Sequence, residues 1–420
     1  MANKPKILFI VPLPPPIHGS AMVSQQIKDS KLIGDTFCCD WVNFSTSRSM
    51  NEIGQRNPIK IWRFISALFI TFWKLLTRRY AFCYLGLTCH GSGFLKDTPF
   101  ALLCKLFRRK IVIHQHNKGM SADVDKWPYH WLLPLVYRNA KVILLSWHLY
   151  LDIERVVKKE QVMICPNGIP QTNSETIIRN NKVPHLLFLS NLIITKGVHV
   201  LLDACKILKD KGQEFVCDFV GAESKEISEW GFKNEVSCRG LEGIVQYHGR
   251  KYGAEKTRFF TDSDIFIHPT YNDCFPLVLL EAMQYQLPIV TTNEGGIPDV
   301  VQDGVNGFIC ERQNAESLAA AIERLLLNPT LRRQMGNAGY EIFRQKFTLE
   351  KFEQRMCECL RAALTTEFCN HGKHGNHGKL IAAGGNRVGE SLREKLEENF
   401  DKKLNRVLSL TKRTQIYPKY

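Results

Sequence analysis

The fold is most constrained by an alternation of short apolar runs with longer helical stretches, which repeats in two series along the chain. The first series contains five apolar runs: Lys6–Val11, Ala81–Leu85, Lys110–His114, Lys141–Ser146 and Gln161–Cys165. The second series contains six: His185–Ser190, Phe215–Val220, Val245–His248, Ile265–His268, Ile289–Thr292 and Gly307–Cys310. Strands that alternate with helices predict parallel sheets covered by helices on both faces. We therefore predict an α/β protein with two doubly wound domains.

The length and one polar segment predict the domain boundaries. The 420 residues exceed the size at which a single hydrophobic core keeps growing. A polar stretch without periodicity, 171–182, separates the two series and is the predicted linker. We expect an N-terminal domain over 1–170 and a second domain over 183–348. A helix over 349–366 is expected to close the body, and a basic C-terminal extension covers 367–420.

The extension carries two features of its own. Residues 371–420 include eleven basic and five acidic residues. A tract at 371–378 alternates histidine with glycine, which suits either metal binding or a flexible glycine-rich spacer, and we favour the spacer. The segment Glu390–Leu410 then has the pattern of an amphipathic helix that is basic at its end.

The composition excludes several classes of protein. A hydrophobic content of 44% with 10% aromatic residues is typical of a globular chain and not of a disordered one. Fourteen cysteines without a C-x-x-C pair predict free thiols in a reducing compartment. Cys38-Cys39 and Cys357-x-Cys359 lack zinc spacing, so no metal and no cofactor are expected.

The positive charge is concentrated in the N-terminal half. The net charge is +15, and the segment from Pro58 to Lys118 contains eleven basic residues against one acid, Asp97. The apolar stretch Ile61–Leu76 contains Arg63 and Lys74 and is too short to span a bilayer. Its aromatic face suits a helix in an anionic membrane interface, but equally a core helix with solvated basic residues. No nucleic-acid partner is expected, because no recognition motif accompanies the charge.

Two acids mark the strongest candidate for a functional site. Asp273 and Glu281 are eight positions apart, and the apolar run between them predicts the start of a helix. Free N–H groups at a helix start favour an anionic ligand. Carboxylates accept hydrogen bonds from vicinal hydroxyls. A nucleotide diphosphate sugar needs both kinds of group, so this pattern predicts a site for such a donor.

The sequence around these acids resembles the acid-x7-acid signature of retaining glycosyltransferases of family 4. The resemblance rests on Phe-Pro-Leu-Val-Leu-Leu-Glu-Ala-Met at 275–283, then on Leu-Pro-Ile-Val and Gly-Gly-Ile-Pro-Asp, and it extends over about residues 5 to 365. It implies the GT-B fold, in which two Rossmann-like domains face each other across a cleft, with ligands bound in that cleft.

The resemblance also implies roles for individual residues. It places His116 and Asp273 at the reaction centre, with Asp273 on the hydroxyls of the donor sugar. It assigns the phosphates to Lys196 and brings the backbone at Gly19 close to a phosphate or the acceptor. Asn191 stands in the donor site where the family usually has arginine, so one positive charge is missing. Asp273 likewise replaces the usual glutamate.

The helix start is the rest of the implied donor site. Phe275, Leu277 and Val278 line the sugar and phosphates, chiefly through their backbone, and Glu281 holds the ribose. Pro276 occupies a place where the family often has glycine, which removes one N–H donor.

The implied reaction is retaining transfer of a sugar from a nucleotide diphosphate donor to the hydroxyl of a saccharide or lipid-linked acceptor. Surface polysaccharide or glycolipid synthesis is the expected role. The expected location is the cytoplasm. The anionic surface on the inner face of the membrane is expected as a further partner. Two alternatives stay open: a nucleotide-sugar epimerase, and a nonenzymatic regulatory or partner subunit with the same fold.

Overall fold

The computed structural model describes residues 4–16, 19–48, 52, 57–172, 179 and 181–365. Residues 1–370 group into one unit. Most of the predicted linker lies outside the described residues. The histidine tract and the helix predicted at Glu390–Leu410 also lie outside them.

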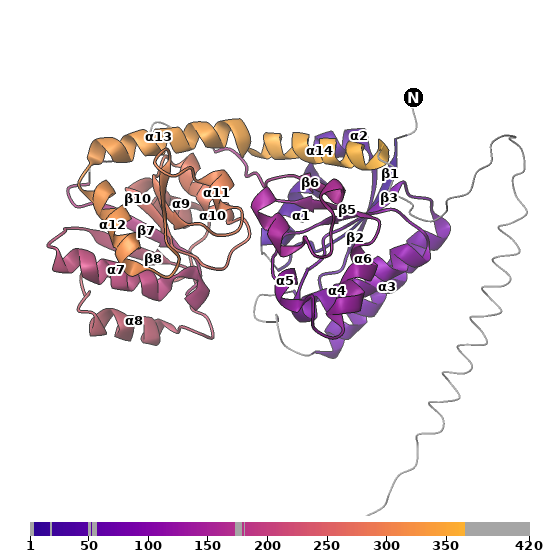
Figure 1. Ribbon diagram of the computed structural model, residues 1–420, viewed down its shortest axis with the longest axis horizontal. Coiled ribbons are helices and arrows are strands. Elements are labelled where there is room, and N and C mark those ends of the chain that lie inside the picture. Colours follow the sequence, from indigo (N-terminus) through magenta and orange to yellow (C-terminus); the bar gives the residue numbers. More distant parts are fainter. Residues whose placement is uncertain are drawn as a thin grey trace, which may run out of the picture. The chain divides into compact units, whose positions relative to one another are not determined.

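A six-stranded parallel sheet organises the N-terminal half (Figure 1), with the order β2-β1-β3-β4-β5-β6. Its strands are β1 (Lys6–Val11), β2 (Cys38–Asn43), β3 (Phe82–Leu85), β4 (Ile111–His114), β5 (Ala140–Leu144) and β6 (Val162–Ile164). The apolar runs in the sequence predict five of these strands but not β2. Burial explains the difference, since β1 is almost wholly buried whereas β2 is largely half-exposed, as befits an edge strand.

Helices connect these strands. They are α1 (Gly19–Asp29), α2 (Lys31–Thr36), α3 (Pro58–Thr77), α4 (Gly91–Leu106), α5 (Met120–Asp123) and α6 (Tyr129–Tyr137), with short 3-10 helices η2 (Trp147–Asp152) and η3 (Lys159–Gln161). The start of α3 is specified locally: the Asn57 side chain accepts a hydrogen bond from the Ile59 N–H, and Pro58 follows it. Proline is favoured there because the first helical N–H has no partner within the helix.

The second half contains another six-stranded parallel sheet, ordered β12-β11-β10-β7-β8-β9. Its strands are β7 (His185–Leu189), β8 (Val216–Val220), β9 (Val245–Tyr247), β10 (Ile265–His268), β11 (Ile289–Thr292) and β12 (Gly307–Cys310). Read from β9, this is the 3-2-1-4-5-6 strand order of the Rossmann fold. The predicted fold class, with two parallel α/β sheets, is confirmed.

The helices of the second half follow the alternation that the sequence predicts. They are α7 (Val198–Asp210), α8 (Glu229–Cys238), α9 (Gly253–Asp262), α10 (Leu277–Gln284), α11 (Ile297–Val300), α12 (Ala315–Leu326) and α13 (Pro329–Lys346), with the 3-10 helix η4 (Ile194–Lys196) before α7. Asn314 and Asn328 cap α12 and α13 by accepting hydrogen bonds from backbone N–H groups three residues ahead.

The last described helix, α14 (Leu349–Thr365), returns to the core of the first sheet. Phe352, Met356 and Leu360 are fully buried in the apolar cluster that contains Ile7 and Phe9 of β1. The Ile169 backbone fixes the entry to this helix by bonding Phe347 and Leu349 at 3.0 and 2.7 Å. The residues after the second sheet therefore complete the core of the first, although the exact domain boundaries remain predictions.

The cysteines in the described part of the chain are free thiols. Cys38 and Cys39 lie at the start of β2, and no cluster of three or more metal-ligating side chains occurs among the described residues. Within those same residues no helix is long and apolar enough to cross a membrane.

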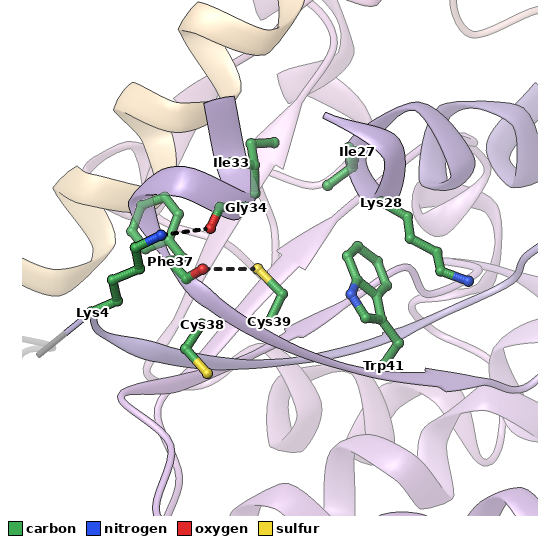
Figure 2. Close-up of a pocket in the computed structure, with 9 residues that line it drawn as sticks. All are labelled: Lys4, Ile27, Lys28, Ile33, Gly34, Phe37, Cys38, Cys39 and Trp41. Atoms are coloured by element: carbon green, nitrogen blue, oxygen red, sulfur yellow. Dashed lines mark hydrogen bonds between the residues drawn. The ribbon is translucent and has the colours of Figure 1, made fainter. Parts of the chain in front are cut away.

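A shallow pocket of about 440 Å³ lies at the outer edge of the first sheet. Figure 2 shows Lys4 and Cys39 at its rim, each bonded to a nearby backbone carbonyl, with Trp41 closing the other side. Besides Lys4 and Phe37, the lining residues belong to α1, to α2 and to the first four residues of β2. Since ligands of open α/β sheets bind at the carboxyl ends of the strands, this pocket lies at the wrong edge for the predicted site.

The buried His114 gives the fold a testable dependence on pH. Burial lowers the pKa of His114 well below its usual value, and the neighbouring His116 lowers it further. The unfolded chain therefore binds a proton that the folded chain does not below about pH 6.5, so stability is full above that pH and decreases as the pH falls. His114→Gln should flatten the slope of unfolding free energy against pH by up to about 1.4 kcal/mol per unit between pH 6.5 and 5.

The measurement is urea unfolding at a series of pH values. His130→Gln is the matched control, because His130 is exposed and should keep the wild-type slope. An unchanged slope in His114→Gln would contradict the proposed contribution of His114.

Candidate active site

The candidate site lies where the chain reverses its direction of travel through the second sheet. From β7 the chain moves to β8 and β9 on one side, then returns to β10 on the other side of β7. Loops after two such adjacent strands diverge, which leaves room for a ligand at their carboxyl ends. Lys196 follows β7 and Asp273 follows β10, so the topology brings both predicted residues to this point.

Asp273 and Lys196 form an ion pair at the centre of the site. The Lys196 Nζ lies 2.5 Å from Asp273 Oδ2 and donates a second hydrogen bond to the Asn272 carbonyl at 3.3 Å. His268 Nε2 lies 3.3 Å from the same Asp273 oxygen. The other oxygen, Oδ1, accepts a hydrogen bond from the Cys274 N–H at 3.0 Å. The site thus holds a carboxylate in a fixed orientation with a cation beside it.

The electrostatics keep Asp273 ionised and His268 neutral. Burial by itself raises the pKa of Asp273, but the His268 hydrogen bond and the Lys196 charge outweigh it and hold that pKa well below its usual range. Burial lowers the pKa of His268, and Asp273 offsets this only in part. A neutral His268 donates from Nε2, which agrees with a buried Nδ1 that has no partner in the described structure.

The start of α10 follows this carboxylate directly. Leu277 and Val278 occupy its first turn, where N–H groups lack partners within the helix, and Pro276 precedes them. The Phe275 ring is buried and packs against Phe347 with ring centroids 6.1 Å apart. Phe275 therefore anchors the loop through its side chain. Ligand binding through its backbone stays a prediction.

Glu281 is the fifth residue of α10 and is half-buried. Lys256 of α9 donates hydrogen bonds of 2.7 Å to both of its carboxylate oxygens. No sequence pattern singles out Lys256, because Lys256 and Glu281 meet only in the folded structure, where α9 lies beside α10. A carboxylate has about four lone-pair positions, so Glu281 can still accept hydrogen bonds from a diol.

Asn191, in the loop after β7, forms a hydrogen bond within the protein. Its Oδ1 accepts a hydrogen bond from the Ala222 N–H at 3.2 Å, which ties the loop after β7 to the loop after β8. Lys196 is thus the cation that this segment brings to Asp273, and no arginine stands at 191 to share that role.

Glu294 is a buried acid beside the site that sequence analysis overlooks. Its carboxylate pairs with Lys118 and with Arg312, the latter at 2.7 Å, and its Oε1 lies 3.4 Å from the Asp273 N–H. Its exposed fraction is 1%. The available signal is an acid two residues after a buried strand and next to Gly295, whose backbone φ of +54° favours glycine.

The first sheet provides a second polar pocket of about 230 Å³ at the carboxyl ends of its strands. His116 and Asn117 line it after β4, Pro12 lines it after β1, and the buried Asp97 lines it from α4. Asp97 accepts a hydrogen bond from the Thr88 N–H at 3.0 Å, and burial raises its pKa. The predicted Gly19 begins α1, next to Ser20 in the lining, so His116 and Gly19 belong to this half of the site.

One chain of contacts connects the two sheets at these residues. Lys118, two positions after His116, pairs with Glu294, which in turn lies beside the Asp273 N–H. His116 also lies against His114, with ring centroids 4.0 Å apart. The structure therefore places the predicted residues in two groups joined through Lys118 and Glu294.

The fold formed by these sheets is GT-B, the fold of solved glycosyltransferase structures. Alr3699/HepE of Anabaena in complex with UDP-glucose superimposes with a TM-score of 0.65 at 18% identity, covering 85% of this chain and 99% of that one. Residues 171–342 match the family model described as glycosyl transferases group 1, and this segment contains Lys196, Asp273 and Glu281.

Curated relatives match over part of their length. The uncharacterized glycosyltransferase MJ1178 of Methanocaldococcus jannaschii is 29% identical over 213 residues, which cover 51% of this chain and 57% of that protein. The capsular polysaccharide biosynthesis glycosyltransferase CapM of Staphylococcus aureus is 27% identical over 161 residues, covering 38% of this chain and 41% of CapM. The chain thus matches less than two thirds of either relative.

Gly197 supports Lys196 and gives a prediction about stability. Its backbone φ is +83°, and a Cβ there would overlap the carbonyl oxygen of Pro269 in the loop after β10. Gly212 has a similar φ of +74° but open space around it. Gly212→Ala should cost about 1 kcal/mol through backbone strain alone, and Gly197→Ala at least about 2 kcal/mol more through the overlap. Urea unfolding of both variants separates the two effects, and equal losses would contradict the predicted overlap.

Proposed function

We propose that this protein transfers a sugar from a nucleotide diphosphate donor to an acceptor hydroxyl, with retention of configuration at the anomeric carbon. The observation that carries the proposal is the fixed Lys196–Asp273 pair directly before the α10 start, at the switch point of a Rossmann sheet. This arrangement lies within the segment that matches glycosyl transferases group 1.

Each part of the donor has a partner in this geometry. The first-turn N–H groups of α10 and the Lys196 ammonium suit the diphosphate, because both offer positive charge to an anion. Glu281, on the same helix, suits the ribose hydroxyls, and Asp273 suits the hydroxyls of the sugar. A similar fold that binds UDP-glucose supports a nucleotide-sugar donor.

In the proposed reaction, the bond between the anomeric carbon and the diphosphate oxygen breaks while the acceptor oxygen bonds the same face of that carbon. The acceptor proton moves to the departing phosphate oxygen. Lys196 stabilises the negative charge that grows on the diphosphate, and such stabilisation is often the largest part of catalysis. Asp273 would hold the sugar in the reacting orientation.

The acceptor is proposed to bind at the first sheet. The pocket beside His116 contains hydroxyl, carboxylate and amide groups, which suit the hydroxyls of a saccharide. His116 would hydrogen-bond the reacting sugar or acceptor at the reaction centre. The name of CapM supports a role in surface polysaccharide synthesis. The proposed acceptor is a saccharide or a lipid-linked molecule at the cytoplasmic face of a membrane.

The donor site is tested by thermal shifts with a panel of nucleotide diphosphate sugars. The matching donor should raise the melting temperature of wild type by on the order of 5 °C at about 100 times its Kd. Glu281→Ala should lose most of that shift because the ribose loses its hydrogen-bond acceptor. Glu255→Ala on the exposed side of α9 is the control and should keep it. No shift with any donor would count against the proposed function and favour a nonenzymatic subunit.

The catalytic assignment is tested by Asp273→Asn, which keeps the shape of the side chain but removes its charge. The transfer rate kcat should fall about 100-fold or more, because a neutral amide cannot form the ion pair that orients Lys196 and the sugar. Asp262→Asn, at an exposed position of α9, should leave the rate unchanged. The measurement is product formation at saturating donor; wild-type turnover in Asp273→Asn would overturn the assignment.

A further inference from the structure

Helix α3 presents a row of large apolar side chains to solvent. We call this row the apolar stripe; its members are Trp62, Ile65, Phe69, Trp73 and Leu76. Their spacing of three or four residues places them on one face of the helix. Trp62 is 70% exposed and Phe69 is 63% exposed, far more than a core position allows. Exposed apolar surface of this extent is typical of an interaction site.

The opposite face of α3 accounts for the packing of the helix. Ala67, Thr71 and Leu75 are its buried residues, and Phe64 packs edge-on against Phe100 of α4 with ring centroids 5.6 Å apart. Figure 1 shows α3 alongside α4 at the margin of the first sheet. The inner face of α3 is therefore core, as one alternative from the sequence expects, while the apolar stripe remains uncovered in the described structure.

Basic residues border the apolar stripe. Arg63 and Lys74 lie on α3, and Arg78 and Arg79 follow its last turn. The acids that face them are few: Glu52 pairs with Arg63 at 3.4 Å, and Asp40 pairs with Arg78 at 2.8 Å and Lys74 at 3.8 Å.

A second basic turn meets the same end of the helix. The Arg109 guanidinium donates hydrogen bonds to the carbonyls of Leu75 and Arg78, which places the turn at 107–110 beside the end of α3. The exposed Arg108 belongs to this turn. Even with Asp40 and Glu52 included, the region around the apolar stripe is strongly positive.

We propose that the apolar stripe and the basic residues around it dock on the surface of an anionic lipid bilayer. Tryptophan and phenylalanine side chains insert between headgroups and acyl chains, while arginine and lysine attract anionic lipid. A second copy of this chain is the poorer occupant, because two such positive surfaces repel each other. Residues 371–420 carry a net positive charge as well and are disfavoured for the same reason.

The docking surface adjoins the pocket in the first sheet. Arg63 donates a hydrogen bond of 2.9 Å to the carbonyl of Thr46, and Thr46 lines the pocket that contains His116. Phe44, another lining residue, packs against Phe100 beneath α3. Docking of α3 therefore brings this pocket to the bilayer surface. This position of the pocket identifies the acceptor as lipid-linked, an inference that rests on the proposed function.

The test is flotation of the full-length protein with vesicles, without any nucleotide sugar. Wild type should bind vesicles of phosphatidylcholine with about 30% phosphatidylglycerol, less so pure phosphatidylcholine, and binding should weaken as salt is raised from about 0.1 to 0.5 M. The triple variant Trp62→Ser, Phe69→Ser and Trp73→Ser should bind at least about tenfold more weakly. Trp230→Ser removes a tryptophan that is 78% exposed on α8 and should bind like wild type.

The charge contribution has its own variant. Arg79→Ala should weaken binding to the phosphatidylglycerol vesicles about fivefold and leave binding to pure phosphatidylcholine unchanged. An unchanged far-ultraviolet circular dichroism spectrum and an unchanged melting temperature in every variant check that folding is intact.

Three outcomes would overturn the proposal: no vesicle binding by wild type, equal binding by the triple variant, or a wild-type dimer that the triple variant dissociates without any change in vesicle binding. The last outcome would assign the apolar stripe to a second copy. Because the assay contains no donor, vesicle binding can succeed where sugar transfer fails, and the reverse also holds.

Discussion

The ion pair between Lys196 and Asp273 joins two segments 77 residues apart in the sequence, and the candidate site is built around it. It fixes the carboxylate, opposes the cost of burying that charge, and holds the loop after β10 against the loop after β7. Gly197 permits this approach because the Pro269 carbonyl leaves no room for a side chain. The start of α10 then follows within four residues of Asp273, so the backbone donors and the carboxylate share one rigid frame.

The two halves of the chain contribute different chemistry. The second sheet supplies a cation, helix N–H groups and carboxylates, which match the parts of a nucleotide sugar. The first sheet supplies a polar pocket at His116 and an outer helix whose apolar face is uncovered in the described structure. Contact between Lys118 and Glu294 connects them, and α14 packs residues that follow the second sheet into the core of the first. The proposed donor site and the proposed acceptor pocket therefore lie within one unit.

Much of the fold follows from local pattern. The buried strands are read directly from their apolar runs, and the cap at Asn57 marks the start of α3. Strand β2 is missed because its half-exposed sequence lacks such a run. The spacing around a helix start singles out Asp273 and Glu281, and the family resemblance singles out Lys196. The sequence does not single out Glu294, Lys256 or Lys118. Each of them forms an ion pair with a residue on another element, and that partner is known only from the structure.

The sequence by itself determined the alternation of strands and helices, the acid pair around a helix start and the positive N-terminal half, because these depend on residue type and spacing along one segment. Tertiary structure decided which charges meet, which face of α3 stays exposed and where the pocket beside His116 lies. The physical reason is that ion pairing and burial depend on distances between segments far apart in the chain, and those distances are set only when the sheets assemble and the helices pack on them.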